Sequence, residues 1–436
     1  MGRAGAIEFR SLKACRVWAG LARVGQGSVF EKGDVMLTRN HLIAGAAALV
    51  ALALVGPANA QAPIKLGELN SYKVFPAFLE PYKKGWELAV EEVNAAGGVL
   101  GRKIEVVSRD DNGNPGDAVR VAEELLSREG ASFLIGTFPS NVGLAVADFA
   151  KQRKVLFIAA EPLTDKIVWD AGNAYTFRLR ASTYMQTAML IPDAAKLNKK
   201  RWAIVYPNYE YGQSATQAFK TLLSAKQPSV AFVTEQATPL GKIDAGAVAQ
   251  ALGDAKPDAI FSSLFGPDLT KFVREGQQRG IFKGVEVFNL LAGEPEYLDP
   301  LKEEAPDGWY VTGYPWSEIK TPEHTKFLNA YQAKYKDYPR LGSVVGYSTI
   351  MSAVEAIRTA GSLDQDKLIA AASGLKVLTP FGMVEYRPID HQSTMGAYVG
   401  RIGVKDGKGY MKEWRFIDGK DALPSDAEIK KMRPAN

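Results

Sequence analysis

Residues 85–126 read GWELAVEEVNAAGGVLGRKIEVVSRDDNGNPGDAVRVAEELL and carry the pattern of one helix–strand–helix unit. Over residues 82–95, apolar side chains recur at the i, i+3, i+4, i+7 spacing, which predicts an amphipathic helix. The glycines at 97–98 are typical of a helix C-terminus. Residues 104–107 form an apolar strand candidate. Residues 114–117 (NPGD) then combine a cap, a proline at the first helical position and an acid in the first turn of the next helix.

The same alternation continues along the chain in two series. Apolar strands separated by helices predict parallel sheets that are covered by helices on both faces. A chain of 436 residues is too long for a single core, so we expect two doubly wound α/β lobes. Strands are expected at residues 64–69, 104–107, 132–136, 155–160, 202–206, 230–234, 259–264 and 285–290. Further helices are expected near residues 322–336, 344–360 and 364–373, and residues 381–417 are strand-like.

The N-terminal part of the chain has the pattern of a secretory signal peptide. Residues 36–60 read MLTRNHLIAGAAALVALALVGPANA, with a basic start, an apolar run and a small-x-small cleavage site. The apolar run at 42–55 is shorter than the roughly 20 residues of a membrane span. Residues 1–35 show no periodic apolar pattern. We therefore expect a non-native extension over 1–35, translation from Met36 and export to the periplasm.

Cleavage after Ala60 changes the charge of the protein. It removes seven of the 53 Lys and Arg residues and three of the 48 Asp and Glu residues, so that the net charge falls from +5 to +1. A nearly neutral chain has no basic field that would attract nucleic acid or lipid headgroups. Cys15, the single cysteine, is also removed, so the exported chain can form no disulfide. These features predict a soluble exported protein.

The sequence lacks the common catalytic motifs. It has no G-x-x-x-x-G-K-[ST] phosphate loop, no G-x-G-x-x-G after the first strand, no H-E-x-x-H and no G-x-S-x-G. Beyond residue 60 the only histidines are His324 and His391, which lie in polar stretches and which we expect to be solvated surface residues. We expect no enzyme, no metal site and no cofactor.

The block at residues 85–126 closely resembles the opening of the branched-chain amino-acid (Leu/Ile/Val) binding protein family. These are periplasmic solute-binding proteins of ABC importers with the type I periplasmic-binding fold. The resemblance runs in order from about residue 64 to about residue 400. Its other segments are FLIGTFPSNVGLAV (133–146), YTFRL (175–179), YGQSATQAF (211–219) and PDAIFSSLFGPDLTKFVREGQQRG (257–280).

The resemblance implies two lobes joined by three crossing strands, with a ligand cleft between them. Lobe 1 would comprise residues 61–178 plus 314–388, and lobe 2 residues 179–313 plus 389–436. The crossings would lie near 177–181, 311–315 and 387–393. The implied function is capture of a small, partly apolar carboxylate by hinge closure and its delivery to the permease. A branched-chain amino acid and an aromatic or aliphatic acid both fit that description.

Three candidate ligand-binding residues lie in two loops of lobe 1, which follow its first and third strands. Ser140 stands where the third strand turns into a helix, at the position where the family holds its ligand's carboxylate. A helix N-terminus offers free N–H groups and a partial positive charge. A plain helix cap is an equally good interpretation of Ser140. Phe138 shapes the same loop, and Phe78 matches an aromatic residue that covers the ligand.

The next loop, AAEPLTDKI (159–167), matches a second ligand-binding turn of the family but departs from its pattern. The family has a small residue and a threonine there, whereas this chain has Glu161, Leu163 and Thr164. Thr164 supplies the expected hydroxyl if the loop is shifted by one residue. We place Glu161 at the cleft rim, with contact to the ligand as the alternative.

In lobe 2, Tyr211 matches a tyrosine that closes on the ligand, although packing is the commoner role of such a residue. Phe265 lies at a strand end in the equivalent ligand wall. Amino-acid binders of this family often pair the ligand's ammonium with an acid, and the alignment puts Leu291 there, with Glu294 three residues later. A buried ammonium without an anion is costly. Leu291 at that place favours a carboxylate without an α-amino group, and Glu294 turned inward favours an amino acid.

Two other functions remain open at this stage. One is a sensor domain of the same fold for amides or amino acids, and the other is an exported hydrolase. The short cleavable signal and the missing catalytic motifs weigh against them. The expected partners are a small-molecule ligand and the permease subunits of an ABC transporter, with no nucleic acid, and the protein is expected to be a monomer.

Overall fold

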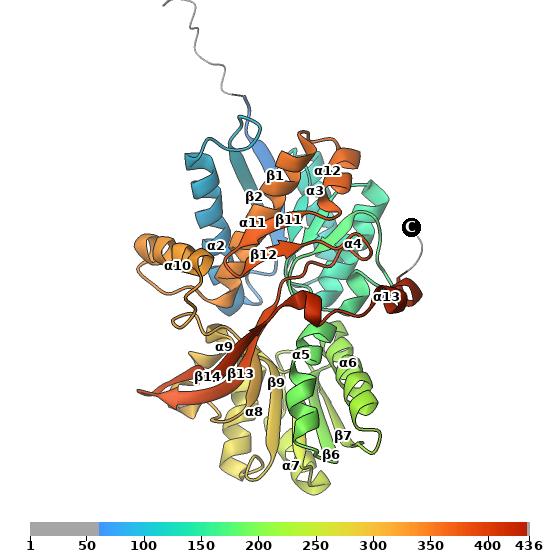
Figure 1. Ribbon diagram of the computed structural model, residues 1–436, viewed down its shortest axis with the longest axis vertical. Coiled ribbons are helices and arrows are strands. Elements are labelled where there is room, and N and C mark those ends of the chain that lie inside the picture. Colours follow the sequence, from blue (N-terminus) through green and yellow to red (C-terminus); the bar gives the residue numbers. More distant parts are fainter. Residues whose placement is uncertain (1–60, 434–436) are drawn as a thin grey trace, which may run out of the picture. The chain divides into compact units, whose positions relative to one another are not determined.

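The computed structural model describes residues 61–433, which form two α/β lobes, each built on its own sheet (Figure 1). This confirms the predicted fold class. The expected extension and signal peptide fall on residues 1–60, outside the described part. The sheet of the first lobe has the order β2-β1-β3-β4-β5, and all its pairs are parallel. Its strands are β1 Ile64–Asn70, β2 Ile104–Asp110, β3 Leu134–Gly136, β4 Phe157–Ala159 and β5 Thr176–Arg178.

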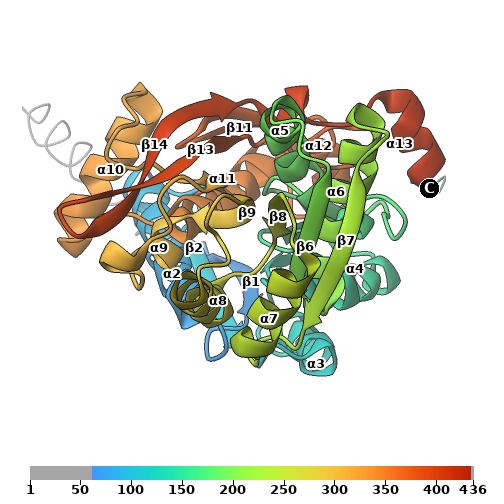
Figure 2. The same ribbon diagram turned by 90° about the horizontal axis from the view of Figure 1, so that it is seen from below.

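The sheet of the second lobe has seven strands in the order β14-β13-β10-β9-β8-β6-β7. The pairs from β7 to β10 are parallel, and β13 and β14 add an antiparallel edge. Figure 2 shows this long β13–β14 hairpin at one side of the sheet and β7 at the other. The strands are β6 Arg201–Pro207, β7 Ala231–Thr238, β8 Ala259–Ser262, β9 Glu286–Gly293, β10 Tyr310–Gly313, β13 Ala397–Lys405 and β14 Lys408–Ile417.

Each lobe combines segments that are far apart in the sequence. The helices of the first lobe are α2 Pro76–Ala95, α3 Pro115–Ser127, α4 Ser140–Arg153, α10 Pro322–Tyr335, α11 Leu341–Ala360 and α12 Gln365–Ala372, with the hairpin β11 Lys376–Thr379 and β12 Gly382–Glu385. Those of the second are α5 Thr183–Lys196, α6 Glu210–Lys226, α7 Ala245–Ala255, α8 Gly266–Arg279 and α9 Pro295–Leu298. The short helices are η1 Asp165–Ile167, η2 Lys302–Glu304, η3 Gly419–Asp421 and the terminal α13 Asp426–Met432.

Glycines allow α11 to pack directly on the backbone of α2. A Cβ atom at Gly346 would lie 2.0 Å from the carbonyl oxygen of Tyr82. In the same way, a Cβ atom at Gly85 would lie 2.0 Å from the carbonyl oxygen of Ser343. No real side chain tolerates such a distance, so these two positions are restricted to glycine by close packing. This contact holds the later part of the chain against the first lobe.

Helix α2 is longer than the pattern predicts. Its first residue is Pro76, whereas the apolar periodicity places the start at residue 82. Proline at the first helical position is favourable because its missing N–H has no helical partner there. The predicted start was therefore six residues too late, and Pro81 lies inside the helix. None of the helices of the described residues has the length and hydrophobicity of a membrane span.

Two of the chain's crossings between the lobes are bonded to each other. The Arg178 amide donates to the carbonyl of His391 at 3.0 Å, and the Ser393 amide donates to the carbonyl of Arg178 at 2.9 Å. The chain then forms β13 and β14 and ends in α13. The Arg433 side chain donates to the carbonyls of Val168 and Asn173, both in the first lobe. The tail predicted for lobe 2 thus ends with contacts to the first lobe.

Candidate functional site

One cavity lies between the lobes and is lined by residues that follow strands of both sheets. Its volume is about 20 Å³. A water molecule needs about 10–15 Å³, so the cavity in this conformation has room for one water and for no larger solute. A solute therefore requires the lobes or the lining side chains to move apart. The lining residues are Phe138, Ser140, Glu161, Leu163, Arg180, Tyr209, Tyr211, Phe265 and Leu291.

Seven of the ten predicted site residues line this cavity: Phe138, Ser140, Glu161, Leu163, Tyr211, Phe265 and Leu291. The other three lie just behind its wall. Phe78 packs on Phe138 with ring centroids 5.1 Å apart, Glu294 bonds to the Arg180 side chain, and the Thr164 amide bonds to Ser140. Which of them contacts a ligand stays a prediction.

Ser140 is the first residue of α4 and is 1% exposed. The residue before it, Pro139, has no backbone N–H. The Ser140 hydroxyl oxygen accepts a hydrogen bond from the Thr164 amide at 3.2 Å, which leaves the hydroxyl proton free to donate. That donor and the N-terminal amides of α4 together form a site suited to a carboxylate.

Thr164 connects the two lobes. Its hydroxyl donates to Oε1 of Glu210 at 2.7 Å, and Glu210 is the first residue of α6 in the second lobe. Lys166 contacts the other oxygen of the same carboxylate at 3.0 Å. The hydroxyl that the sequence predicts for the ligand is therefore engaged across the lobe boundary.

Arg180 is a buried cation at the back of the cavity, and the sequence pattern did not predict it. Its Nη1 donates to Glu161 Oε2 at 2.8 Å, and its Nη2 bonds to Glu294. The guanidinium also lies 5.2 Å from the ring centroid of Phe78. Arg180 follows the first crossing, so it joins an acid of the first lobe to an acid of the second. Glu161 is 2% exposed, and the prediction that placed it at the cleft rim was wrong.

Arg180, Glu161 and Glu294 form a buried trio, and burial dominates its electrostatics. It raises the pKa of Glu161 to about 7 against the opposing effect of Arg180, and it raises the pKa of Glu294 as well. Burial also lowers the pKa of Arg180, but the two carboxylates outweigh it and hold that pKa above its ordinary value. Oε1 of Glu161 and Oε2 of Glu294 are buried and have no hydrogen-bond partner among residues 61–433. Each acid can therefore accept one more donor.

The backbone at Leu291 turns the chain toward this trio. Leu291 has φ = 78°, a left-handed conformation that is uncommon for a leucine, and its amide donates to Thr312 Oγ1 at 3.0 Å. The Glu294 amide donates back to the carbonyl of Leu291 at 2.9 Å, which closes a tight turn at the end of β9. Leu291 lines the cavity, while the acid three residues later reaches Arg180.

Aromatic rings from both lobes meet above the cavity. The Phe138 ring of the first lobe packs on Phe75 at 4.9 Å and lies 6.2 Å from Phe265 of the second lobe, measured between ring centroids. Tyr211 lies 5.7 Å from Phe265 in an edge-to-face arrangement. The Tyr211 hydroxyl is buried without a hydrogen-bond partner in the described part of the chain. The wall therefore suits an apolar or aromatic group and offers one free hydroxyl.

The prediction that both histidines are solvated was wrong. His324 is 0% exposed, and its Nε2 lies 2.6 Å from the Tyr314 hydroxyl. His391 is 6% exposed and stacks on Phe177 at 3.9 Å between ring centroids. Burial lowers the pKa of each to about 4. Within residues 61–433 no group of His, Cys, Asp and Glu side chains is arranged to hold a metal ion.

Comparison with known proteins agrees with this architecture. A family model described as periplasmic binding protein matches residues 74–408. The Leu/Ile/Val-binding protein homolog 8 of Brucella suis is 26% identical over 419 residues, which cover 90% of this chain and 98% of the relative.

Two solved solute-binding proteins of ABC transporters from Rhodopseudomonas palustris have a similar structure. The protein of strain BisB5, in complex with 3,4-dihydroxy benzoic acid, is 25% identical with a TM-score of 0.73 and covers 82% of this chain and 98% of its own. The protein of strain HaA2, in complex with p-hydroxybenzoic acid, is 26% identical with a TM-score of 0.73 and covers 85% and 100%. Together with the two lobes and the cavity between them, these matches show that the chain belongs to the periplasmic binding protein family.

Proposed function

We propose that this solute-binding protein captures a small amino acid with an apolar or aromatic side chain in the periplasm and delivers it to an ABC permease. The observation that supports this most strongly is the charge of the buried trio. Arg180 carries one positive charge between two carboxylates, Glu161 and Glu294, and each of those keeps one oxygen without a partner among the described residues. A ligand ammonium would supply the missing charge and the missing donors.

Burial of an unpaired charge costs free energy, and this cost favours a ligand that pairs with the two acids. An unpaired buried carboxylate is unfavourable by several kcal/mol, and an acid in that position takes up a proton instead. The raised pKa values of Glu161 and Glu294 express that cost. Binding of an ammonium would favour the ionised acids, so it would release protons near neutral pH. This release distinguishes an amino acid from a ligand that has only a carboxylate.

The remaining parts of the cavity suit the rest of an amino acid. Ser140 and the N-terminus of α4 would hold the α-carboxylate, and the rings of Phe138, Phe265 and Tyr211 would cover the side chain. Because these residues belong to different lobes, a ligand would first bind to one lobe, and closure would bring the residues of the other lobe onto it and complete the binding site. The permease would then recognise the closed form, a shift in population and not a chemical step.

Calorimetry and thermal shift test this proposal. The purified protein is unfolded, refolded to remove bound solute, and screened with Leu, Ile, Val, Phe, benzoate and 4-hydroxybenzoate. A ligand at about 100 times its dissociation constant adds about 2.7 kcal/mol of stability. We expect amino acids to stabilise the protein and to release protons on binding, measured in buffers of different ionisation enthalpy. Stabilisation by none of these solutes would count against the proposed ligand class.

An aromatic acid without an amino group is the second candidate. It is favoured by the two similar structures that were solved with hydroxylated benzoic acids. In that case Glu294, whose pKa burial raises, would keep its proton and donate to the ligand. Stabilisation by benzoate or 4-hydroxybenzoate alone, without proton release, would select this candidate over the first.

A further inference from the structure

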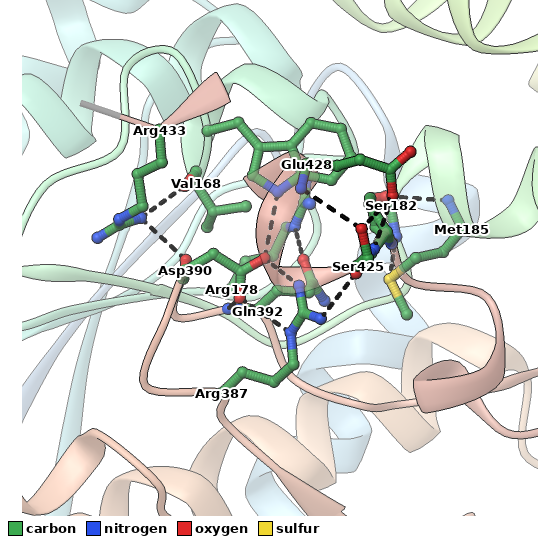
Figure 3. A network of polar contacts seen from close by, with 12 residues as sticks. Val168, Arg178, Ser182, Met185, Arg387, Asp390, Gln392, Ser425, Glu428 and Arg433 are labelled. Carbon is green, nitrogen blue, oxygen red and sulfur yellow. Dashed lines mark hydrogen bonds and ion pairs between the residues drawn. The ribbon is translucent and has the colours of Figure 1, made fainter. Parts of the chain in front are cut away.

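Arg178 lies at the first crossing between the lobes and takes no part in the cavity wall. It is the last residue of β5 and is 0% exposed. Its backbone pairs with the third crossing through His391 and Ser393. Figure 3 shows its side chain within a polar network together with Gln392, Asp390 and Arg433. It is therefore a buried charged group at the point where the two crossings meet.

Neutral oxygens hold two nitrogens of the Arg178 guanidinium, and the third, Nη2, is buried without a hydrogen-bond partner among residues 61–433. Its Nη1 donates to the carbonyl of Leu163 at 3.2 Å and to that of Thr164, and its Nε bonds to Oε1 of Gln392. Gln392 in turn donates to the carbonyl of Arg180 at 3.1 Å. Among the ion pairs of the described chain none includes Arg178. Burial lowers its pKa to about 10, so the group stays charged at neutral pH.

A buried guanidinium without a carboxylate partner is expensive, and simple packing would use an apolar residue instead. Lysine would offer a single nitrogen there, whereas two nitrogens of the planar guanidinium, Nη1 and Nε, reach the two carbonyls and the glutamine at once. The residue therefore fixes the relative position of three segments: the loop at 161–164, the end of β5 and the third crossing.

The loop at 161–165, which Arg178 holds, contacts the cavity on one side and α6 of the second lobe on the other. Glu161 and Leu163 line the cavity. Thr164 donates to Glu210 at 2.7 Å, and Asp165 accepts a bond from Ser214 at 3.0 Å; both of these partners belong to α6 of the second lobe. The same short loop thus forms part of the ligand wall and part of the contact that keeps the lobes together.

We infer that Arg178 is a positioning residue for solute retention: it holds the carbonyls of Leu163 and Thr164 against the crossing strands and thereby keeps the ligand wall and the lobe contact in register. This inference rests on the proposed function. Its consequence is kinetic. Encounter of the solute with the open protein does not need the contacts to α6, whereas retention in the closed protein does, so Arg178 governs release more than capture.

The first test uses R178K, which keeps the charge and loses the fork. The matched control is R109K, because Arg109 is an arginine of the same lobe whose partner, Glu129, also lies in that lobe. Stopped-flow tryptophan fluorescence with L-leucine and 4-hydroxybenzoate as probes gives both rate constants. We expect R178K to speed release about tenfold, as the loss of a bond to a charged group implies, and to leave association within about twofold. Unchanged release would overturn the inference.

A second variant covers the case in which R178K does not fold. Q392M removes the side-chain acceptor of the Arg178 Nε, together with the donor to the Arg180 carbonyl, and leaves the two loop carbonyls in place. Q392M should also accelerate release of the probe, by a smaller factor than R178K. A Q392M protein that releases the probe at the wild-type rate would count against the inference in the same way.

Hydrogen exchange of the ligand-free protein separates this inference from the proposed function. In R178K we expect faster amide exchange in residues 163–166 and 210–214 and unchanged exchange in β1 and β3. Faster exchange throughout the first lobe would reduce Arg178 to a packing residue, and unchanged exchange would overturn its positioning role. If the wild type binds neither probe, the proposed ligand class fails, and the exchange pattern still decides the role of Arg178.

Discussion

The backbone amide of Gly342 donates to Oε1 of Glu296 at 2.6 Å, and this bond joins the first lobe to the second. Gly342 lies at the N-terminus of α11, so the carboxylate also meets the positive end of that helix. Glu210 of the second lobe likewise accepts a hydrogen bond from the hydroxyl of Thr164 in the loop at 161–166. In both contacts an acid of the second lobe reaches a donor of the first, so opening of the lobes exposes carboxylates.

Burial raises the pKa of Glu296 to about 7, so the test is made at pH 8, where the carboxylate is charged. There E296Q should weaken the closed form, because the amide keeps an oxygen for Gly342 and loses the charge that the helix end favours. A charge at a helix N-terminus contributes about 0.3–2 kcal/mol, so ligand release should accelerate by a factor between about 2 and about 30. Stopped-flow release kinetics would measure this. E235Q is the control, since Glu235 pairs with Lys220 inside one lobe, and it should leave the rate unchanged. Equal rates for E296Q and wild type would contradict the role given to this contact.

The stability of the ligand-free protein should depend on Glu161 in a defined pH range. Its folded-state pKa of about 7 lies above the ordinary value of 4.5, so the folded protein holds this proton more tightly than the unfolded chain. The resulting stability is fully present below pH 4.5 and is lost as the pH rises through about 7. From about pH 5 to about pH 8, the wild type should therefore lose more stability than E161Q, measured by urea unfolding. Parallel curves for the two proteins would show that Glu161 is ionised throughout.

S140A should reduce affinity for any ligand that carries a carboxylate. The free hydroxyl proton at the start of α4 would be lost, and a bond to a charged group is worth about 1.5–3 kcal/mol, which is at least about tenfold in the dissociation constant. Titration calorimetry checks this. S127A is the control, because the Ser127 hydroxyl bonds within α3 to the carbonyl of Glu123. An S140A protein with wild-type affinity would restrict Ser140 to its role as a helix residue.

Y211F should stabilise the ligand-free protein. The Tyr211 hydroxyl is buried without a partner in the described residues, and removal of such a group recovers roughly 1 kcal/mol. Y386F is the matched control, because the Tyr386 hydroxyl donates to Ser352 at 2.9 Å, and its loss should destabilise by a similar amount. Thermal unfolding of both variants decides between these signs. Destabilisation by Y211F would indicate that a water molecule satisfies its hydroxyl.

G346A should destabilise the first lobe, because its methyl group would meet the Tyr82 carbonyl at 2.0 Å. Such overpacking costs about 1–3 kcal/mol. G253A is the control on a helix with open space around the added atom, and it should stabilise by up to about 1 kcal/mol. Denaturant unfolding of both variants measures the difference. A neutral G346A would mean that α11 can move away from α2.

The fold could be predicted well because its signals are local. Apolar strands and amphipathic helices alternate with little interruption, and the block at 85–126 shows three elements in sequence with their caps. The errors come from non-local effects. Helix α2 begins six residues before its predicted start and continues through Pro81, and it packs closely against α11. His324 and His391 stand in polar stretches, and their burial depends on Tyr314 and Phe177, which lie elsewhere in the chain.

Most individual residues of the site could be predicted from the sequence, but the pairing of Arg180 with its two acids could not. Ser140, Phe138 and Phe265 could be predicted without the structure, because they stand at strand ends and helix starts. Arg180 was missed because an arginine near a strand end usually reaches solvent. Its two acids are 19 and 114 residues away, and no pattern in the sequence brings them together. A second arginine two positions earlier, in the run FRLRAS, was the one hint that charge enters the core there.

The way each lobe is assembled from separate segments also bears on the order of synthesis. Helix α11 completes the first lobe from residues 341–360, β13 and β14 extend the second sheet from residues 397–417, and Arg433 closes onto the crossings. The first lobe therefore lacks α11 until residue 360 has been made, and the second sheet lacks its edge until residue 417 has been made. Domains made of contiguous sequence fold as they emerge, but this arrangement postpones completion until the end. A polypeptide with that property stays without its complete fold for longer than one whose domains are contiguous in sequence.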